Sequence, residues 1–402
     1  MQTPDYLLHV SEGAEEISEM LHNEIINRII ERMMLRIGRG EKYLLTAQDK
    51  WQIETLQQAG YLLEDIQKNI AKATKLQQTE IAEAMEEAGV KTLEYDDEIY
   101  RSVGLDPKPF TQSPHLIRIA QRNYEATMGE FRNFTRTMAL QAQQLFISEC
   151  DRAYTLVSSG ALSYSEAVKE VINKVVLDGV KVTYPSGKTD TIETATLRAV
   201  RTGISQMSGQ ITDARMEEMN WDIVLVSSHL GARVTEKEDY TNHYWWQGKF
   251  YSKSGKNKQF LSFSLCGCGK IQGLCGANCR HSYGPGDGEH NPFKEYDSEE
   301  NRKQYEKEQR QRTFERRIRE SRREVMGLKE AVDNCKDDKA KFELDLQYQK
   351  KAALLAKQNK DYNDYCSSNN LRTRADRIQI AKWDRKQASA ARGAAQRYKN
   401  AK

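Results

Sequence analysis

The sequence predicts a mainly α-helical protein with a small α+β module. Three observations support this. Apolar residues recur at helical spacing over long stretches of the first 160 residues, strand-like runs occur in the middle of the chain, and the last hundred residues combine a high charge with helical patterning. The chain has 402 residues, which exceeds one ordinary domain. We expect three consecutive regions: a helical region at 1–160, an α+β module at 161–290 and an extended basic helical tail at 291–402.

The composition narrows the class of protein. Charged residues make up 30% of the chain and hydrophobic residues 38%, which favours long solvated helices over one large core. No apolar run approaches the length of about 18 residues that indicates a membrane span, and we expect no signal peptide. Seven cysteines, four of them between Cys266 and Cys279, do not resemble a secreted disulfide framework. We therefore expect a protein that folds in a reducing cytoplasm.

Long helices are the expected elements of the first region. From Ile17 onward, apolar residues form a broad helical stripe that ends at Gly38 and Gly40. Two further helical patterns cover residues 51–59 and 62–88. These patterns predict an N-terminal region made of separate amphipathic helices.

One helix of this region is expected to be unusually long. Ser113 is a favourable N-cap residue and Pro114 is preorganised for a first helical turn. No helix breaker interrupts residues 116–157, so the helix would span on the order of 60 Å. Such a rod is more typical of a protein that bridges parts of an assembly than of a compact enzyme.

The middle region combines short helices with strands. Residues 163–176 have an amphipathic helical pattern, and residues 180–193 alternate around a Pro-Ser-Gly turn, which is typical of a β-hairpin. Thr194 or Thr196 is expected to cap the next helix. One face of that helix is apolar and is expected to face the core: Leu197, Val200, Ile204, Met207, Ile211 and Ala214.

Three sequence blocks follow, around further strands predicted at 222–228 and 260–264. The blocks read SSHLGAR at 227–233, HYWWQGKFYS at 243–252 and GLCGANCRHSYGPGDG at 273–288. Together and in this order they resemble the signature of the tailed-phage minor capsid protein 2 family. That family is related to the head morphogenesis proteins typified by the F protein of phage Mu. The resemblance covers roughly the first 290 residues, and more loosely the tail.

The resemblance implies a low-copy structural component of a phage virion, in the head interior or at the portal vertex, made in the bacterial host cytoplasm. The implied functions are procapsid assembly, DNA packaging or DNA delivery. The implied partners are the portal protein, the major capsid or scaffold protein and packaged double-stranded DNA, with no membrane. The core signature residues of the module are Arg233, Trp245, Trp246, Gly248 and Lys249. The tryptophan pair beside Lys249 also fits a base-stacking platform, although packing of one ring in the core and one on the rim is the favoured interpretation.

The cysteines and histidines of these blocks are candidate ligands of a structural zinc ion, because thiolates and imidazoles suit Zn²⁺. The candidates are Cys266, Cys268, Cys275, Cys279, His281, His229 and His243. Their C-x-C-x6-C-x3-C-x-H spacing differs from the common pair of C-x2-C knuckles. Packing of small cysteines under a glycine-rich loop therefore stays open as an alternative.

A second alternative is an enzyme, a thiol- or metal-dependent hydrolase centred on His229, His243 and Cys279. In that case the thiol would be the nucleophile and an imidazole its base. No oxyanion hole or orienting carboxylate stands at a telling spacing, so the sequence favours a protein that is not an enzyme.

The charge of the chain is divided unevenly. Residues 301–402 hold 28 lysines and arginines against 15 aspartates and glutamates, whereas residues 1–300 hold 33 against 43. We expect an exposed single helix or weak coiled coil in this tail, with sequence-independent attraction to packaged DNA. Candidate DNA contacts are Arg312, Arg316, Arg317, Arg319, Arg322 and Arg323. Local neutralisation of these charges by neighbouring glutamates is the alternative.

Overall fold

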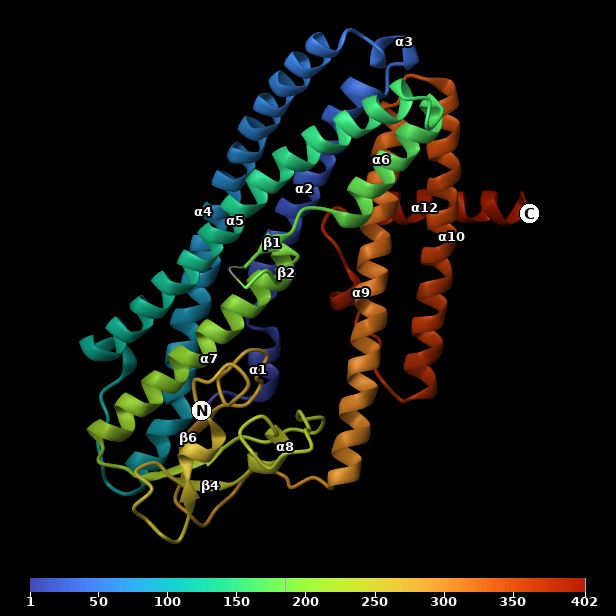
Figure 1. Ribbon diagram of the computed structural model, residues 1–402. Coiled ribbons are helices and arrows are strands. Elements are labelled where there is room, and N and C mark those ends of the chain that lie inside the picture. The colour runs from blue at the N-terminus through green and yellow to red at the C-terminus, as the bar shows by residue number, and fades with distance from the viewer. Residues whose placement is uncertain (185, 402) are drawn as a thin grey trace. The chain divides into compact units, whose positions relative to one another are not determined.

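The computed structural model describes residues 1–184 and 186–401, and it confirms a mainly α-helical protein with a small α+β module (Figure 1). The helices are α1 (Pro4–His9), α2 (Glu12–Ile37), α3 (Glu41–Leu44), α4 (Gln48–Ser102), α5 (Pro114–Ser158), α6 (Tyr164–Asp178), α7 (Ile192–Glu218), α8 (His243–Trp246), α9 (Ser298–Asn334), α10 (Asp338–Ser368), α11 (Ala375–Ile378) and α12 (Arg385–Asn400), with 3-10 helices η1 (Phe110–Gln112) and η2 (Phe263–Cys266). The strands are β1 (Val182–Thr183), β2 (Thr189–Asp190), β3 (Ile223–Val226), β4 (Phe250–Ser252), β5 (Leu261–Ser262) and β6 (Tyr283–Pro285). Among the described residues, no helix combines the length and the apolar character needed to cross a lipid bilayer.

The chain folds into two compact units, each made from three separate stretches of sequence. The first unit contains Met1–Glu15, Lys75–Arg132 and Thr194–Gln309. The second unit contains Glu16–Thr74, Asn133–Glu193 and Arg310–Lys402. The long helices therefore contribute segments to both units, and the three regions expected from the sequence describe the order along the chain only.

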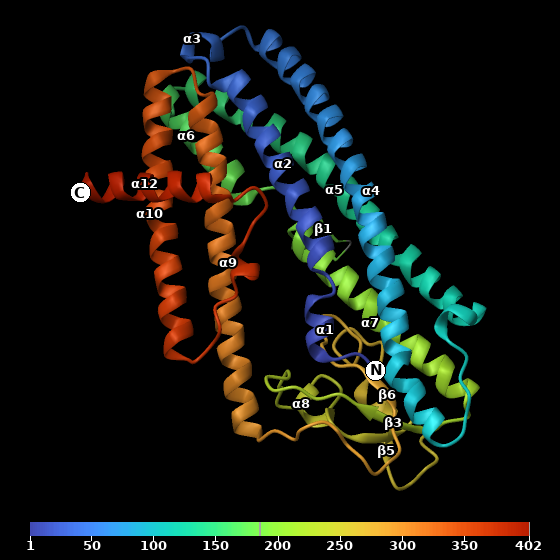
Figure 2. The ribbon, with the colours of Figure 1, turned by 180° about the vertical axis from the view of Figure 1, so that it is seen from behind.

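The sheet of the first unit has the strand order β5-β4-β3-β6. The central strand β3 pairs antiparallel with both β4 and β6, and β4 pairs parallel with β5. Strands β3, β5 and β6 are labelled in Figure 2. Helix α7 packs on β6 at Gly209, whose carbonyl accepts a hydrogen bond from the Tyr283 hydroxyl at 2.9 Å. A β-carbon at Gly209 would lie 3.0 Å from that hydroxyl, so the glycine permits this close approach.

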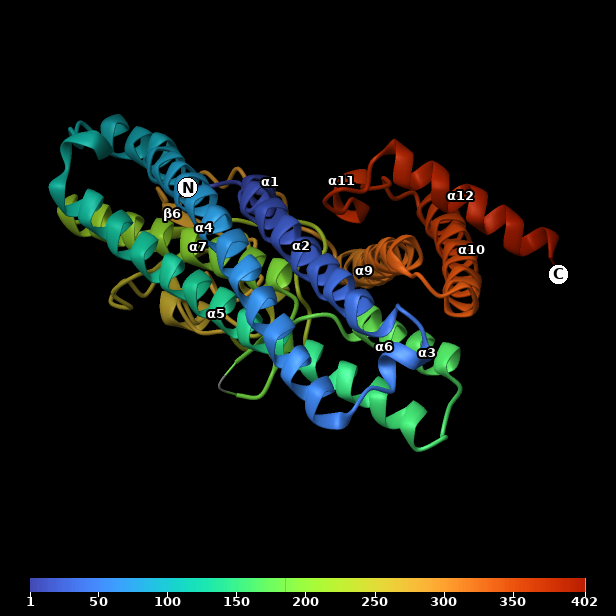
Figure 3. The same cartoon turned by 90° about the horizontal axis from the view of Figure 1, so that it is seen from above.

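The second unit packs α9 against α2 and α6. A β-carbon added at Gly327 of α9 would lie within 3.1 Å of both Val176 and Ile30, so the absence of a side chain lets the three helices meet there. Helix α10 runs beside α9 and contacts both α6 and α12. Figure 3, together with Figure 1, shows that α12 crosses α10.

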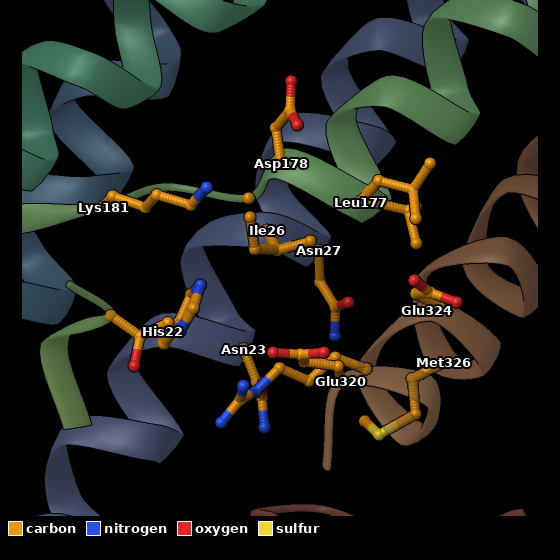
Figure 4. A pocket seen from close by; sticks show the side chains of 14 residues that line it. His22, Asn23, Ile26, Asn27, Leu177, Asp178, Lys181, Glu320, Glu324 and Met326 are labelled. Atoms are coloured by element: carbon orange, nitrogen blue, oxygen red, sulfur yellow. The ribbon is translucent and has the colours of Figure 1, made fainter. Parts of the chain in front are cut away.

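A buried ionic network lies in the second unit. The Arg323 guanidinium pairs with Glu193 and, at 2.9 Å, with Glu19. The second oxygen of Glu193 lies 3.0 Å from His22 Nδ1. A cavity of about 130 Å³ adjoins this network. In Figure 4 its lining comes from α2, represented by His22, from the end of α6, and from α9.

Two expected helix boundaries were wrong. The patterns at 51–59 and 62–88 belong to one helix, α4, which continues through Gly60. A single glycine inside a helix costs only about 1 kcal/mol, and buried residues on both sides, Ala59 and Leu62, offset it by packing. Helix α7 already begins at Ile192, so the threonines at 194 and 196 lie within its first turns and do not cap it.

The expected hairpin is present, as β1 pairs antiparallel with β2, although its predicted turn residue Pro185 lies outside the described residues. The strand predicted at 222–228 corresponds to β3, and that at 260–264 to the shorter β5 followed by η2. The short helix predicted at 163–176 corresponds to α6, which a Ser163–Glu166 capping box begins.

The expectation of an exposed single helix in the tail was also wrong. The apolar seam of α9 is buried, with Ile318 and Ala331 fully covered and Val325 2% exposed. The seam is narrow, but α2 and α6 approach it closely at Gly327. The second helical run also extends further than expected, because α10 ends at Ser368.

Candidate metal centre

A glycine-dependent loop forms the floor of the centre. After η2, the backbone folds back so that Leu274 N donates to Cys266 O at 3.0 Å. A β-carbon at Gly273 would lie 2.1 Å from Gly267 O, and one at Gly276 would lie 2.2 Å from the carbonyl of Lys270. These distances exclude any side chain, so the glycines of the GLCGANC block are required by the close packing of the backbone.

Arg233 braces this loop from the side. Its guanidinium donates to the carbonyls of Gln272 and Ala277, each at 3.2 Å. The segment that carries Arg233 is held in turn by Asn301 of α9, whose Oδ1 accepts from the amides of Gly231 and Ala232 at 2.8 and 2.9 Å. The side chain of Arg233 therefore satisfies two backbone carbonyls of the loop.

Helix α8 supplies the wall of the centre. Asn242 caps the helix by accepting from the amide of Trp245. The indole of Trp246 is buried and donates to Tyr240 O at 3.1 Å. Trp245 is only partly buried and lies beside Lys249, whose ammonium is 6.0 Å from the ring centroid. One ring of the pair thus lies in the core and the other near the surface.

Gly248 completes this wall by turning the chain from α8 into β4. Its φ of +66° lies in the left-handed region that favours glycine. Its amide donates to Val226 O at 3.1 Å, which brings the turn onto β3. The sheet and α8 are therefore fixed to one another directly beside the centre.

Three side chains with metal-binding atoms converge inside this frame. One candidate ligand atom from each of His243, Cys279 and His281 lies within 4.8 Å of the other two, and all three residues are buried. The Cys279 sulfur is 3.7 Å from His281 Nδ1. The rings of both histidines also contact Trp246, with centroid distances of 4.6 and 4.8 Å.

Hydrogen bonds fix the tautomer of each imidazole. His281 Nε2 lies 2.9 Å from Gln247 Oε1, and His243 Nε2 lies 2.8 Å from Gln272 O. Because both partners can only accept, each Nε2 must carry the proton. Each Nδ1 then holds a lone pair, which is the state that a metal ligand requires.

The environment keeps the three groups uncharged. Burial lowers the pKa of His243 to about 4. Burial, together with the neighbouring imidazoles of His229 and His243, lowers the pKa of His281 well below its usual range. Burial raises the pKa of the Cys279 thiol to about 11. Without a cation, the centre is therefore a neutral, water-shielded cluster.

The other four candidate ligands lie outside the group of three. His229 stacks on His281 at a centroid distance of 4.4 Å, and its Nδ1 lies 3.0 Å from Leu230 O. Cys266 and Cys275 are buried in the same hydrophobic cluster, and Cys268 is exposed. The structure thus divides the seven sequence candidates into three that converge and four that surround them.

The thiol-hydrolase alternative receives no support from this environment. A nucleophilic cysteine needs a lowered thiol pKa and access to its substrate, whereas the Cys279 thiol is buried and its pKa is raised. His229, which this alternative uses as a base, also directs Nδ1 toward a backbone carbonyl and toward Arg280.

Sequence reasoning missed three residues that position the centre: Gln247, Gln272 and Asn301. Gln247 is part of the HYWWQGKFYS block, so its place beside two tryptophans was a usable signal. Gln272 acts through its backbone carbonyl, which no side-chain pattern reveals. Asn301 lies in the charged sequence that begins the tail, where nothing marks it as a partner of residues 70 positions earlier.

The candidate DNA contacts are distributed unevenly over α9. Arg316 and Arg317 are exposed, whereas Arg312 and Arg319 are half-buried. Arg319 donates to the carbonyl of Arg377. Arg322 donates to Ile378 O and stacks on Trp383, and Arg323 belongs to the ionic network of the second unit. Several of the predicted contacts are thus already engaged within the chain.

The long helices and the braced α+β module define a mainly α-helical protein with a small α+β module. The model of the phage minor capsid protein 2 family matches residues 2–362, and the chain belongs to that family. It is accordingly a structural protein of the phage head, associated with the virion and with other head components. Neither the curated proteins nor the solved structures contain a match to this chain. The further relation to Mu F-like proteins stays a prediction.

Proposed function

We propose that the protein docks on the portal protein of the phage head through its long helices and takes part in procapsid assembly. The observation that carries this proposal is an exposed apolar face on α4. Ile53 and Leu56 are 58% and 59% exposed. Gly60 lies on the same face of the helix, seven residues after Ile53 and four after Leu56. A β-carbon placed at Gly60 would meet nothing within 4 Å.

This face has the chemistry of a helix-docking surface. Two branched apolar side chains offer contact area, and the glycine lets a partner helix approach the backbone closely. The family supplies the setting, because a minor capsid protein must contact other head proteins. Among these, the portal vertex is the proposed position, since a low-copy protein suits a site that occurs once in each head.

Co-purification tests the docking. The full chain and the portal protein of the same phage would be produced together in a bacterial host. A variant with both Ile53→Asp and Leu56→Asp should lose at least about tenfold of the co-purified portal protein, because charges would be buried at the contact. Phe342→Asp is the matched control, since Phe342 is an exposed apolar residue on α10, 68% accessible. If the double variant co-purified as much portal protein as the unchanged chain, the proposed docking face would be refuted.

We further propose that Arg316 and Arg317 contact packaged DNA through its phosphates. They are the exposed members of the predicted arginine group. Changing both to glutamine should reduce the slope of log affinity against log salt by about 2. Changing the exposed Arg392 and Lys399 of α12 to glutamine makes the same change in net charge and serves as the control. An equal loss in both variants would indicate attraction to net charge rather than contact at α9. Deletion of the tail is a poorer test, because Ile318 and Val325 belong to the core of the second unit.

A further inference from the structure

We propose that His243, Cys279 and His281 bind one Zn²⁺ ion, with His243 Nδ1, Cys279 Sγ and His281 Nδ1 as the protein ligands. The three side chains come from two segments that are separate in sequence, α8 and the chain between the glycine-rich loop and β6. A bound ion would therefore tie the loop, the helix and the edge of the sheet together.

The separation of the ligand atoms suits zinc. Bonds of about 2.3 Å to sulfur and 2.0–2.1 Å to nitrogen in a tetrahedral arrangement place the two atoms roughly 3.6 Å apart. The distance from Cys279 Sγ to His281 Nδ1 is 3.7 Å. A ligand atom of His243 lies within 4.8 Å of the other two, so the side chains would move closer together on binding.

The hydrogen bonds around the ligands are those of a prepared site. Ligating histidines usually donate their second ring N–H to a carbonyl or carboxylate, which fixes the ring and leaves the other nitrogen free to bind. Gln247 Oε1 and Gln272 O take these two protons. Arg233 donates to the same Gln272 carbonyl, so the brace of the loop and the orientation of His243 are coupled.

The donor set favours zinc over harder ions. One thiolate with two imidazoles is a combination of soft and intermediate ligands, which disfavours Mg²⁺ and Ca²⁺. On binding, the Cys279 thiol would release its proton to solvent and coordinate as thiolate. The same donor set also suits copper, so the identity of the ion has to be measured directly.

Metal analysis of the full chain tests the proposal. The protein would be purified without chelator and its metals quantified. We expect about one zinc per chain, and loss of that zinc in Cys279→Ser and in His281→Gln. Cys266→Ser is the matched control, because Cys266 is a fully buried cysteine of the same hydrophobic cluster outside the group of three. Stoichiometric zinc in Cys279→Ser, zinc loss in Cys266→Ser as well, or copper in place of zinc would overturn the assignment.

Cobalt exchange keeps the test valid if the ligand variants do not fold. The unchanged chain, with its zinc replaced by Co²⁺, should show thiolate-to-cobalt charge-transfer absorption of an intensity that corresponds to one sulfur ligand. Gln247→Leu should lower the affinity for cobalt on the order of 10–100-fold, whereas Gln247→Glu, which keeps an acceptor, should retain it. A folded wild-type chain that takes up neither zinc nor cobalt would show that the cluster is a packed, metal-free core.

Discussion

The two units each bury histidine beside other functional groups, but the two environments differ in charge. In the first unit, His243 and His281 are accompanied by a thiol and by acceptors that fix their tautomers. In the second unit, His22 is accompanied by Glu193, which also pairs with Arg323. The first cluster is neutral and the second is built from opposite charges.

The difference comes from the partners and not from the depth of burial. Burial alone raises the pKa of Glu193, but the Arg323 guanidinium and the contact with His22 outweigh it, so the pKa of that carboxyl lies well below its usual range. Burial lowers the pKa of Arg323, and Glu193 and Glu19 outweigh that effect and raise it. In the first unit, the neighbouring imidazoles of His229 and His243 and the cations of Arg280 and Arg233 reinforce the effect of burial on the pKa of His281.

The ionic network and the neutral cluster represent two uses of buried polar groups. The ionic network supplies its own counter-charges, so it needs no further ion and acts as a structural connection between α9 and the rest of the second unit. The neutral cluster brings ligand atoms of two imidazoles and a thiol within 4.8 Å of one another. This convergence of ligand atoms is why the first cluster carries the metal proposal.

The largest expected effect is the loss of the cation from the ionic network. Arg323→Met would leave Glu193 and Glu19 buried without their partner, and we expect it to lower the free energy of unfolding by about 3–5 kcal/mol. Urea denaturation monitored by circular dichroism measures this change. The control Arg316→Met, at an exposed position, should change stability by less than about 0.5 kcal/mol. A loss below about 1 kcal/mol in Arg323→Met would mean that Arg323 does not stabilise the buried carboxylates of Glu193 and Glu19.

A smaller effect is expected in the acid range. The pKa of Glu193 is depressed in the folded state, so its contribution is fully present above the unfolded value of about 4.5 and is lost as the pH falls toward the folded value. The free energy of unfolding of the wild type should therefore fall between pH 5 and 3 by on the order of 2 kcal/mol more than that of Glu193→Gln. Glu64→Gln, at an exposed position of α4, should follow the wild-type curve. If the free energy of unfolding of Glu193→Gln fell with pH in parallel with that of the wild type, the Glu193 carboxyl would not be the ionised group that this prediction requires.

The smallest effect concerns the packing of the neutral cluster. Trp246→Phe keeps an aromatic ring beside the two histidines but removes the N–H that bonds Tyr240 O at 3.1 Å. We expect a loss of about 1.5 kcal/mol from the unpaired carbonyl and the smaller ring. Trp245→Phe is the matched control and should cost less, because Trp245 is only partly buried. Thermal unfolding of the two variants measures both losses of stability. An equal loss in both would mean that the Trp246 ring contributes no more to stability than the Trp245 ring.

The sequence by itself determined the local structure. The Ser163–Glu166 capping box begins α6 where the short helix was expected, and Pro114 is the first residue of the 45-residue helix α5. The strand β3 lies within the predicted apolar run. These features depend on the preferences of residues that are close in the chain, and such preferences are encoded locally.

Only the tertiary structure decided which distant residues meet. The sequence favoured Cys275, Cys279 and His281 as three ligands and left the rest open, whereas the fold of the loop against α8 brings together His243, Cys279 and His281. The arginines of α9 appeared equivalent along the sequence, yet Arg323 faces Glu193 while Arg316 faces solvent. Helical periodicity shows which residues share a face, but not which partner covers that face. The partner is set by long-range packing, and packing also determines which charges are compensated.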